Sequence, residues 1–123
     1  MSGADCDVAI VGAGPYGLAA AAHLHAADGL DIRLFGEPMS FWERQMPHGM
    51  LLRSPYGASN IADPEQGLTL DSYGSARRAP LSRPVPLGDF VEYGRWFQRQ
   101  ALPMLDTRQV ATVEANGQLK AWT

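Results

Sequence analysis

A glycine-rich hexapeptide, GAGPYG at residues 12–17, constrains the fold of this chain more than any other feature. It follows CDVAIV at residues 6–11, a run bounded by glycine that is typical of a strand buried on both faces. It opens PYGLAAAAHLHAA, an alanine-rich stretch with helical spacing and a stop signal at Asp28-Gly29. DIRLF at residues 31–35 then predicts a second strand. Strand, glycine-rich turn, helix and strand within about thirty residues predict a βαβ unit.

The hexapeptide matches the dinucleotide-binding pattern G-x-G-x-x-G. Because glycine is common, such a match alone is weak evidence for nucleotide binding, and the neighbouring strand and helix strengthen it. Between a strand and a helix, the pattern is typical of dinucleotide binding. The first glycine permits the tight turn, the second lets backbone approach a pyrophosphate, and the third lets the helix pack closely on the strand. Helix N-terminal amides would then meet phosphate oxygens. We expect the pyrophosphate site at Gly12, Gly14, Pro15, Tyr16 and Gly17; the alternative is a tight turn that binds nothing.

An acidic residue about twenty positions after the glycines is expected to receive ribose hydroxyls. The second strand ends at Phe35-Gly36, so the acid comes one place late, as Glu37. Glu37 either reaches a ribose or is an ordinary solvated carboxylate at a strand end.

Residues 36–86 are rich in proline and glycine, and periodicity survives only in SFWERQM and LTLDSYGSA. Their many large apolar side chains argue against disorder, so we interpret this insertion as a structured lining segment. PLGDFVEYGRWFQRQALP has its apolar side chains mainly on one face and predicts an amphipathic helix closed by Pro103. A strand at residues 109–114 and Asn116-Gly117 before LKAW predict a C-terminal β-hairpin.

Two further groups of residues in the insertion are candidates for cofactor contact. Trp42 and Met50, with neighbouring apolar residues, either wall a flat aromatic cofactor or form plain core. Arg53 and Ser54 place a guanidinium and a hydroxyl either beside a ring or phosphate, or in a surface turn before Pro55. No residues show the spacing of a metal site or a hydrolase triad, and the catalytic residues stay unknown.

The composition excludes several classes of protein. The net charge is −3 and the arginines are scattered, so no basic stripe for nucleic acid is present. The N-terminus has no Lys or Arg before Arg33, which does not fit a signal peptide, and no apolar stretch suits a membrane span. We therefore expect a cytoplasmic protein. The single cysteine, Cys6, is expected to be a small buried hydrophobe.

Several segments together resemble the N-terminal FAD-binding region of the flavin-dependent monooxygenases, in particular the lysine and ornithine N-hydroxylases and related FAD/NAD(P)-binding oxidoreductases. These segments are DVAIVGAGPYGLAAAAHL, FGEPMSFWERQMPHGMLLRS, IADP, TLDSYG and VPLGDFVEYGRWFQRQ. The resemblance implies that Gly12, Gly14 and Gly17 hold the FAD pyrophosphate. It places Trp42, Met50, Arg53 and Ser54 near the flavin. In that family NADPH reduces FAD, and the flavin then carries oxygen to a nucleophilic substrate.

Two sequence features of this family are not found in the chain. The second glycine-rich motif, which binds NADPH, and the late strand that returns to the FAD domain are absent from it. We therefore expect an α/β fold: a single, partial Rossmann-like FAD/NAD(P)-binding domain over residues 1–123, truncated before the NADPH domain, with an unpaired sheet edge. One hypothesis is an FAD-binding portion or small subunit, inactive alone, whose flavin site is completed by a protein partner or homo-oligomer. The alternative is a non-catalytic nucleotide-binding or protein-interaction module.

Overall fold

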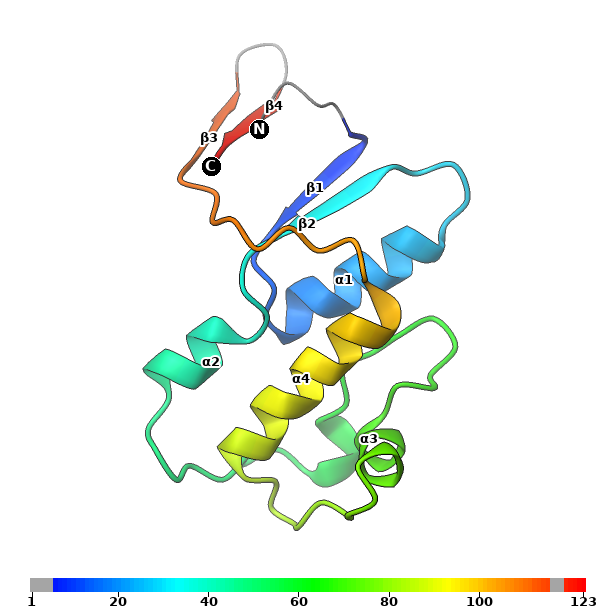
Figure 1. Cartoon of the computed structure of the whole chain (residues 1–123), viewed down its shortest axis with the longest axis vertical. Coiled ribbons are helices and arrows are strands. Elements are labelled where there is room, and N and C mark those ends of the chain that lie inside the picture. The colour runs from blue at the N-terminus through cyan, green and yellow to red at the C-terminus, as the bar shows by residue number, and fades with distance from the viewer. Residues whose placement is uncertain (1–5, 116–118) are drawn as a thin grey trace.

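The computed structural model describes residues 6–115 and 119–123, and its first elements form the predicted βαβ unit. Strand β1 (Val8–Val11) and strand β2 (Ile32–Phe35) pair in parallel, with Val8 opposite Ile32 and Val11 opposite Phe35. Helix α1 (Pro15–Ala26) connects them and packs against both (Figure 1). The strand, helix and strand predicted from the sequence are thereby confirmed, with both strands shorter than predicted.

Strand β1 is not buried on both faces, and this prediction was wrong. Val8 and Ile10 are half-buried, whereas Ala9 and Val11 are exposed, Val11 to 53%. The reason is that α1 covers one face, and β1 has a strand partner on one edge only. Cys6 precedes the strand and is half-buried, so it is not the buried strand residue that the sequence predicts.

The outer edge of β2 is partly covered by the segment that follows the last helix. Phe35 forms a parallel bridge with Asp106, and the amide of Gly36 donates to the Asp106 carbonyl at 2.9 Å. The amide of Asp106 donates in turn to the Leu34 carbonyl at 2.9 Å. The open edge of this sheet, within the described residues, is therefore that of β1.

The loop-rich insertion contains three short helices: α2 (Ser40–Gln45), the 3-10 helix η1 (Tyr56–Ala58) and α3 (Leu70–Ala76). The Thr69 hydroxyl accepts the amide of Ser72 at 3.1 Å and caps α3. Tyr93 joins the loop before α3 to the core: its hydroxyl accepts the Ile61 amide at 2.9 Å and donates to the Leu68 carbonyl at 2.7 Å. The segment is thus structured, as predicted, and its role in lining a site stays a prediction.

Helix α4 (Leu87–Ala101) is the centre of the packing (Figure 1). It contacts α1, α2 and α3, and its buried side chains lie at helical spacing, which confirms the predicted amphipathic helix. Gly94 lets α2 approach, because a Cβ there would lie 2.5 Å from the sulfur of the fully buried Met39. The largest fully buried side chains form one core: Tyr93, Phe35, Phe97, Leu18, Leu34, Met39, Leu70, Leu102 and Val85.

Strands β3 (Thr112–Ala115) and β4 (Leu119–Trp122) pair antiparallel, which confirms the predicted C-terminal hairpin. The Asn116-Gly117 turn predicted for it lies outside the described residues. Val113, Leu119 and Trp122 are exposed, and residues of the hairpin and of β1 together line a cavity of about 330 Å³. Among the described residues the hairpin and the β1–β2 pair are two separate sheets.

Candidate functional site

The glycine turn between β1 and α1 has the geometry that its sequence predicts. Gly12 has φ +106°, a conformation that side chains disfavour, and its amide donates to the Phe35 carbonyl at 2.9 Å. A Cβ on Gly17 would collide with the carbonyl oxygen of Gly12 and lie 3.0 Å from its carbon. The absence of that Cβ lets α1 begin directly against the end of β1, which is the packing role of the third glycine.

The N-terminus of α1 has free hydrogen-bond donors and open space beside them. Gly14 is the N-cap and supplies no side-chain cap, Pro15 follows it, and the first turn contains no acidic residue. The amides of Tyr16 and Gly17 receive no acceptor from the described residues, as expected for the first turn of a helix. A Cβ on Gly14 would meet nothing within 4 Å, and Tyr16 is 91% exposed. This arrangement fits a phosphate group, which the amides and the helix dipole both favour.

Glu37, the predicted ribose acid, lies next to this turn despite its offset in the sequence. Gly36 has φ +127°, and a Cβ there would lie 3.4 Å from the amide nitrogen of Ala13. The Met39 amide donates to the Ala13 carbonyl at 2.9 Å, which fixes the residues after β2 against the motif. The glycine thus lets the chain pass close to the turn, and the acid follows it immediately.

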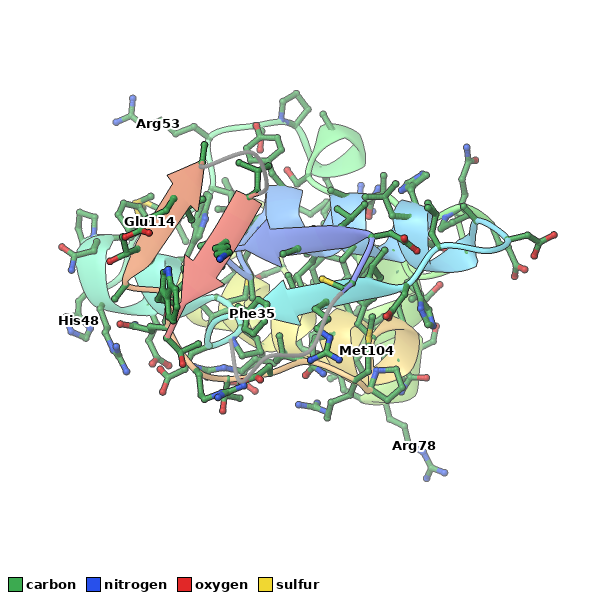
Figure 2. All side chains as sticks on the ribbon, turned by 90° about the horizontal axis from the view of Figure 1, so that it is seen from above. Phe35, His48, Arg53, Arg78, Met104 and Glu114 are labelled. Carbon is green, nitrogen blue, oxygen red and sulfur yellow. The ribbon has the colours of Figure 1, made fainter. Side chains whose placement is uncertain are left out.

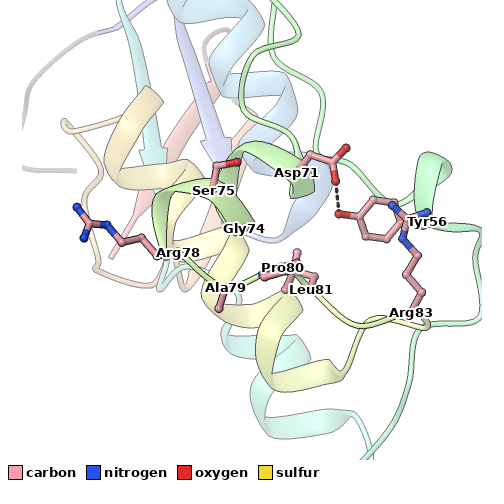
Figure 3. Close-up of a pocket in the computed structure, with 9 residues that line it drawn as sticks. All are labelled: Tyr56, Asp71, Gly74, Ser75, Arg78, Ala79, Pro80, Leu81 and Arg83. Carbon is pink, nitrogen blue, oxygen red and sulfur yellow. Dashed lines mark hydrogen bonds between the residues drawn. The ribbon is translucent and has the colours of Figure 1, made fainter.

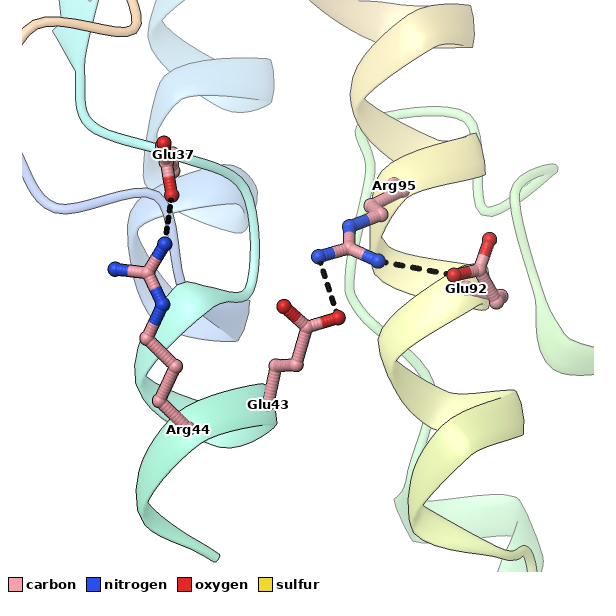
Figure 4. Close-up of polar contacts among 5 residues, drawn as sticks. All are labelled: Glu37, Glu43, Arg44, Glu92 and Arg95. Carbon is pink, nitrogen blue, oxygen red and sulfur yellow. Dashed lines mark hydrogen bonds and ion pairs between the residues drawn. The ribbon is translucent and has the colours of Figure 1, made fainter.

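Arg44, which the sequence did not single out, holds the Glu37 carboxylate. Its Nη2 atom lies 2.8 Å from Glu37 Oε2, and both side chains are about half exposed (Figure 4). Among the described residues no second donor binds this carboxylate, so Oε1 remains available to a ligand. The two residues are seven positions apart across a turn, and this spacing does not predict an ion pair from the sequence.

A second ion-pair group fixes the orientation of α2 relative to α4 (Figure 4). Arg95 on α4 contacts Glu43 of α2 at 2.9 Å and Glu92 of its own helix at 3.0 Å. Burial acts to lower the pKa of Arg95, but the hydrogen bonds that it donates to Glu43 and Glu92 raise the pKa above its ordinary value. Helix α2 thereby contacts α4, and Arg44 in the last turn of α2 reaches back along the helix to Glu37, which precedes it.

Trp42 and Met50 pack against the protein interior. The Trp42 ring lies 5.0 Å from that of Phe90 in an edge-to-face contact, and both Trp42 and Met50 are partly buried against the core. The Met50 carbonyl accepts the amide of Leu87 at 2.8 Å. These contacts correspond to the plain-core alternative, and the contact of either residue with a cofactor stays a prediction.

Arg53 and Ser54 line a different cavity, of about 420 Å³, whose lining includes no residue of the glycine motif. Arg53 extends from the ribbon into solvent (Figure 2). The Ser54 hydroxyl lies 2.6 Å from that of the buried Ser59. The structure therefore brings Glu37 to the motif and places Arg53 and Ser54 in a second location.

Two features are absent from residues 6–115 and 119–123. No group of three His, Cys, Asp or Glu side chains there is arranged to hold a metal ion. None of the helices described is long and apolar enough to cross a membrane.

Comparison with known proteins gives a structural match. No protein-family model and no curated protein matches the sequence. Among solved structures, the chain is similar to bacillithiol disulfide reductase Bdr (YpdA) from Staphylococcus aureus, with a TM-score of 0.67 and 18% sequence identity. The match covers 95% of this chain and 33% of the reductase, so the chain spans about a third of the length of that protein. At this identity the match shows the fold alone: the α/β arrangement of part of that reductase, with a parallel β1–β2 pair and a C-terminal antiparallel hairpin.

Proposed function

We propose that this chain supplies the ADP-binding part of an FAD site in a flavin-dependent oxidoreductase, and that further polypeptide completes the flavin site. The observation that carries the proposal is the glycine turn: free amides at the N-terminus of α1, open space beside Gly14, and Glu37 held next to the turn. The likeness in fold to a disulfide reductase supports a place among redox enzymes.

The residues of the turn have distinct roles in this proposal. The amides of Tyr16 and Gly17 bind pyrophosphate oxygens, and Glu37 Oε1 accepts ribose hydroxyls while Arg44 holds Oε2. Arg44 is a positioning residue, because it fixes the carboxylate and offsets its charge near the phosphates. FAD, when bound, would supply the redox chemistry, and the protein would supply binding and orientation.

Within the flavin-dependent oxidoreductases we favour the N-hydroxylating monooxygenases. The segments that carry this resemblance, SFWER and F-x-x-Y-x-x-W-F-Q, form α2 and the centre of α4, which pack together beside the glycine turn. Trp42, Met50, Arg53 and Ser54 would lie toward the flavin in such a protein. The same proposal includes NADPH as the reductant of the complete protein and a cytoplasmic location, because the resemblance to this group implies both.

A non-catalytic interaction module is the second candidate, and the open edge of β1 favours it. The backbone amides of Ala9 and Val11 point to this edge, because the alternate residues Val8 and Gly12 donate their amides to the Asp31 and Phe35 carbonyls on the other side. Exposed Val113, Leu119 and Trp122 lie on the nearby hairpin. An edge of this kind can accept a strand from a partner or a second copy.

Ligand-induced stabilisation of the purified chain tests the first proposal. ADP and FAD are expected to raise the melting temperature, whereas FMN, which lacks the ADP half, is expected to have no effect. A ligand at ten times its Kd stabilises a protein by about 1.4 kcal/mol, which such a measurement resolves. If millimolar ADP and FAD leave the melting temperature unchanged, the dinucleotide proposal is wrong and the interaction module is favoured.

Gly14→Ala is the matched variant for this experiment. The methyl group meets nothing in the protein, so folding is expected to be nearly unchanged, yet it occupies the space where phosphate approaches. Gly67→Ala, also in open space but in a remote loop, is the control. The proposal requires that Gly14→Ala weakens ADP-induced stabilisation and that Gly67→Ala does not.

A further inference from the structure

A cavity away from the glycine turn has the charge of an anion site. Its volume is about 420 Å³, and two segments, residues 52–56 and 83–85, form its lining. The lining contains two guanidinium groups, Arg53 and Arg83, and no carboxylate. Its other residues are mainly apolar: Leu52, Pro55, Tyr56, Pro84 and Val85. A cavity of this size is suited to a small organic ligand.

Backbone contacts join the two segments next to two apolar lining residues, Leu52 and Val85, which we call the cavity floor. The Leu52 amide donates to the Val85 carbonyl at 2.8 Å, and both of these side chains are buried. Leu51 and Pro86 form an antiparallel bridge beside them. The floor is therefore apolar and fixed, as a site for a hydrophobic group requires.

Arg83 is positioned by an aromatic ring and lacks an anionic partner. Its guanidinium carbon lies 3.8 Å from the centroid of the Tyr56 ring, within the range of a cation–π contact. Among the described residues no carboxylate lies within ion-pair distance of Arg83. A guanidinium over a ring has five N–H donors, more than its contact with Tyr56 uses, and can offer two of them to a planar, two-oxygen acceptor.

Asp71, which lies beside Tyr56, makes no ion pair with Arg83. It accepts the Tyr56 hydroxyl at 2.7 Å and lines a neighbouring cavity, whose lining also includes Tyr56 and Arg83 (Figure 3). Arg78, which also lines that neighbouring cavity, points away from Arg83 (Figure 3). The positive charge of Arg83 is thus not neutralised by a contact, and Arg53 at the rim adds a second positive charge.

We propose that this cavity binds a small organic carboxylate with an apolar body. Arg83 would receive the carboxylate, Arg53 would close on it from the rim, and the apolar body would lie on Leu52 and Val85. The lining shares Arg53 and Ser54 with the residues proposed to lie toward the flavin, but none with the glycine turn, so binding here and ADP binding at the turn can be tested separately.

Calorimetric titration with benzoate tests the site, with benzamide as its neutral analogue and inorganic phosphate as an anion without an apolar body. All titrations use one ionic strength, because exposed charges are screened by salt. Saturable benzoate binding is expected, with benzamide and phosphate each weaker by about tenfold or more. Equal affinity for benzoate and benzamide would refute the role of charge, and equal affinity for phosphate would refute the role of the apolar floor.

Variants of the two cavity arginines locate the binding. Arg83→Gln is expected to weaken benzoate binding by about tenfold or more, and Arg53→Gln by a smaller factor, because Arg53 is extended into solvent. Arg83→Lys keeps the charge but loses the two-donor edge, and an intermediate loss is expected. Arg99→Gln removes the same charge from an exposed position of α4 and is the control. Equal effects of Arg83→Gln and Arg99→Gln would overturn the proposal, whatever the affinity of the unmodified protein for FAD.

Discussion

Removal of one oxygen atom, by Tyr93→Phe, is expected to loosen the attachment of the loop before α3 to the core. The Tyr93 hydroxyl accepts the Ile61 amide at 2.9 Å and donates to the Leu68 carbonyl at 2.7 Å. The side chain is fully buried, and this burial is the main reason that the pKa of Tyr93 is raised to about 12. The hydroxyl therefore stays protonated at neutral pH and can make both bonds.

The magnitude follows from the two backbone groups that lose their partner. A buried donor or acceptor left without a hydrogen bond costs about 1–3 kcal/mol, and Leu68 is only partly buried. We expect a loss of about 2–4 kcal/mol in the free energy of unfolding, which corresponds to a fall of roughly 10 °C or more in melting temperature for a domain of this size. Urea denaturation measures the loss directly.

Tyr73→Phe is the matched control. Tyr73 belongs to the same aromatic group, with its ring centroid 5.9 Å from that of Tyr93, but its hydroxyl makes no hydrogen bond to the described residues. Its loss is expected to change stability by less than about 0.5 kcal/mol. Faster hydrogen exchange of the Ile61 amide should accompany Tyr93→Phe alone. The reasoning is refuted if the two variants have equal stability, or if the Ile61 amide remains equally protected in both.

Three other perturbations test the packing and the electrostatics. Gly17→Ala drives a methyl group into the carbonyl of the first motif glycine, and a loss of about 1–3 kcal/mol is expected in urea denaturation; an unchanged midpoint would contradict the close contact. Gly94→Ala should lose a similar amount because its Cβ meets a buried methionine, whereas Gly88→Ala, in open space on the same helix, should gain about 0.5–1 kcal/mol. Hydrogen bonds from Arg108 lower the pKa of Asp106 to about 2. The stabilising effect of this carboxylate is therefore present above its unfolded pKa of about 4 and is lost as the pH falls toward 2. An NMR titration should show the low pKa of Asp106 in the unmodified protein and an ordinary one in Arg108→Gln, and an unshifted pKa in both would be contrary to this account.

Much of the fold could be predicted because its signals are local. The glycine turn, the alanine-rich helix and the apolar face of α4 are each specified by one short, continuous stretch of sequence. The same holds for the C-terminal hairpin. The exposure of β1 could not be predicted, because its hydrophobic composition does not tell which faces receive neighbours.

The candidate site likewise has one part that the sequence predicts and another that depends on the packing of distant segments. The sequence by itself determined the glycine turn, since a strand, three spaced glycines and a helix leave few conformations for the backbone between them. Only the tertiary structure decided that Gly36 brings Glu37 beside that turn and that Arg44 holds its carboxylate. It also separated Arg53 from the turn and placed it in a cavity with Arg83, thirty residues away in the chain. Such contacts depend on how distant segments pack, and a sequence pattern specifies only the segments themselves.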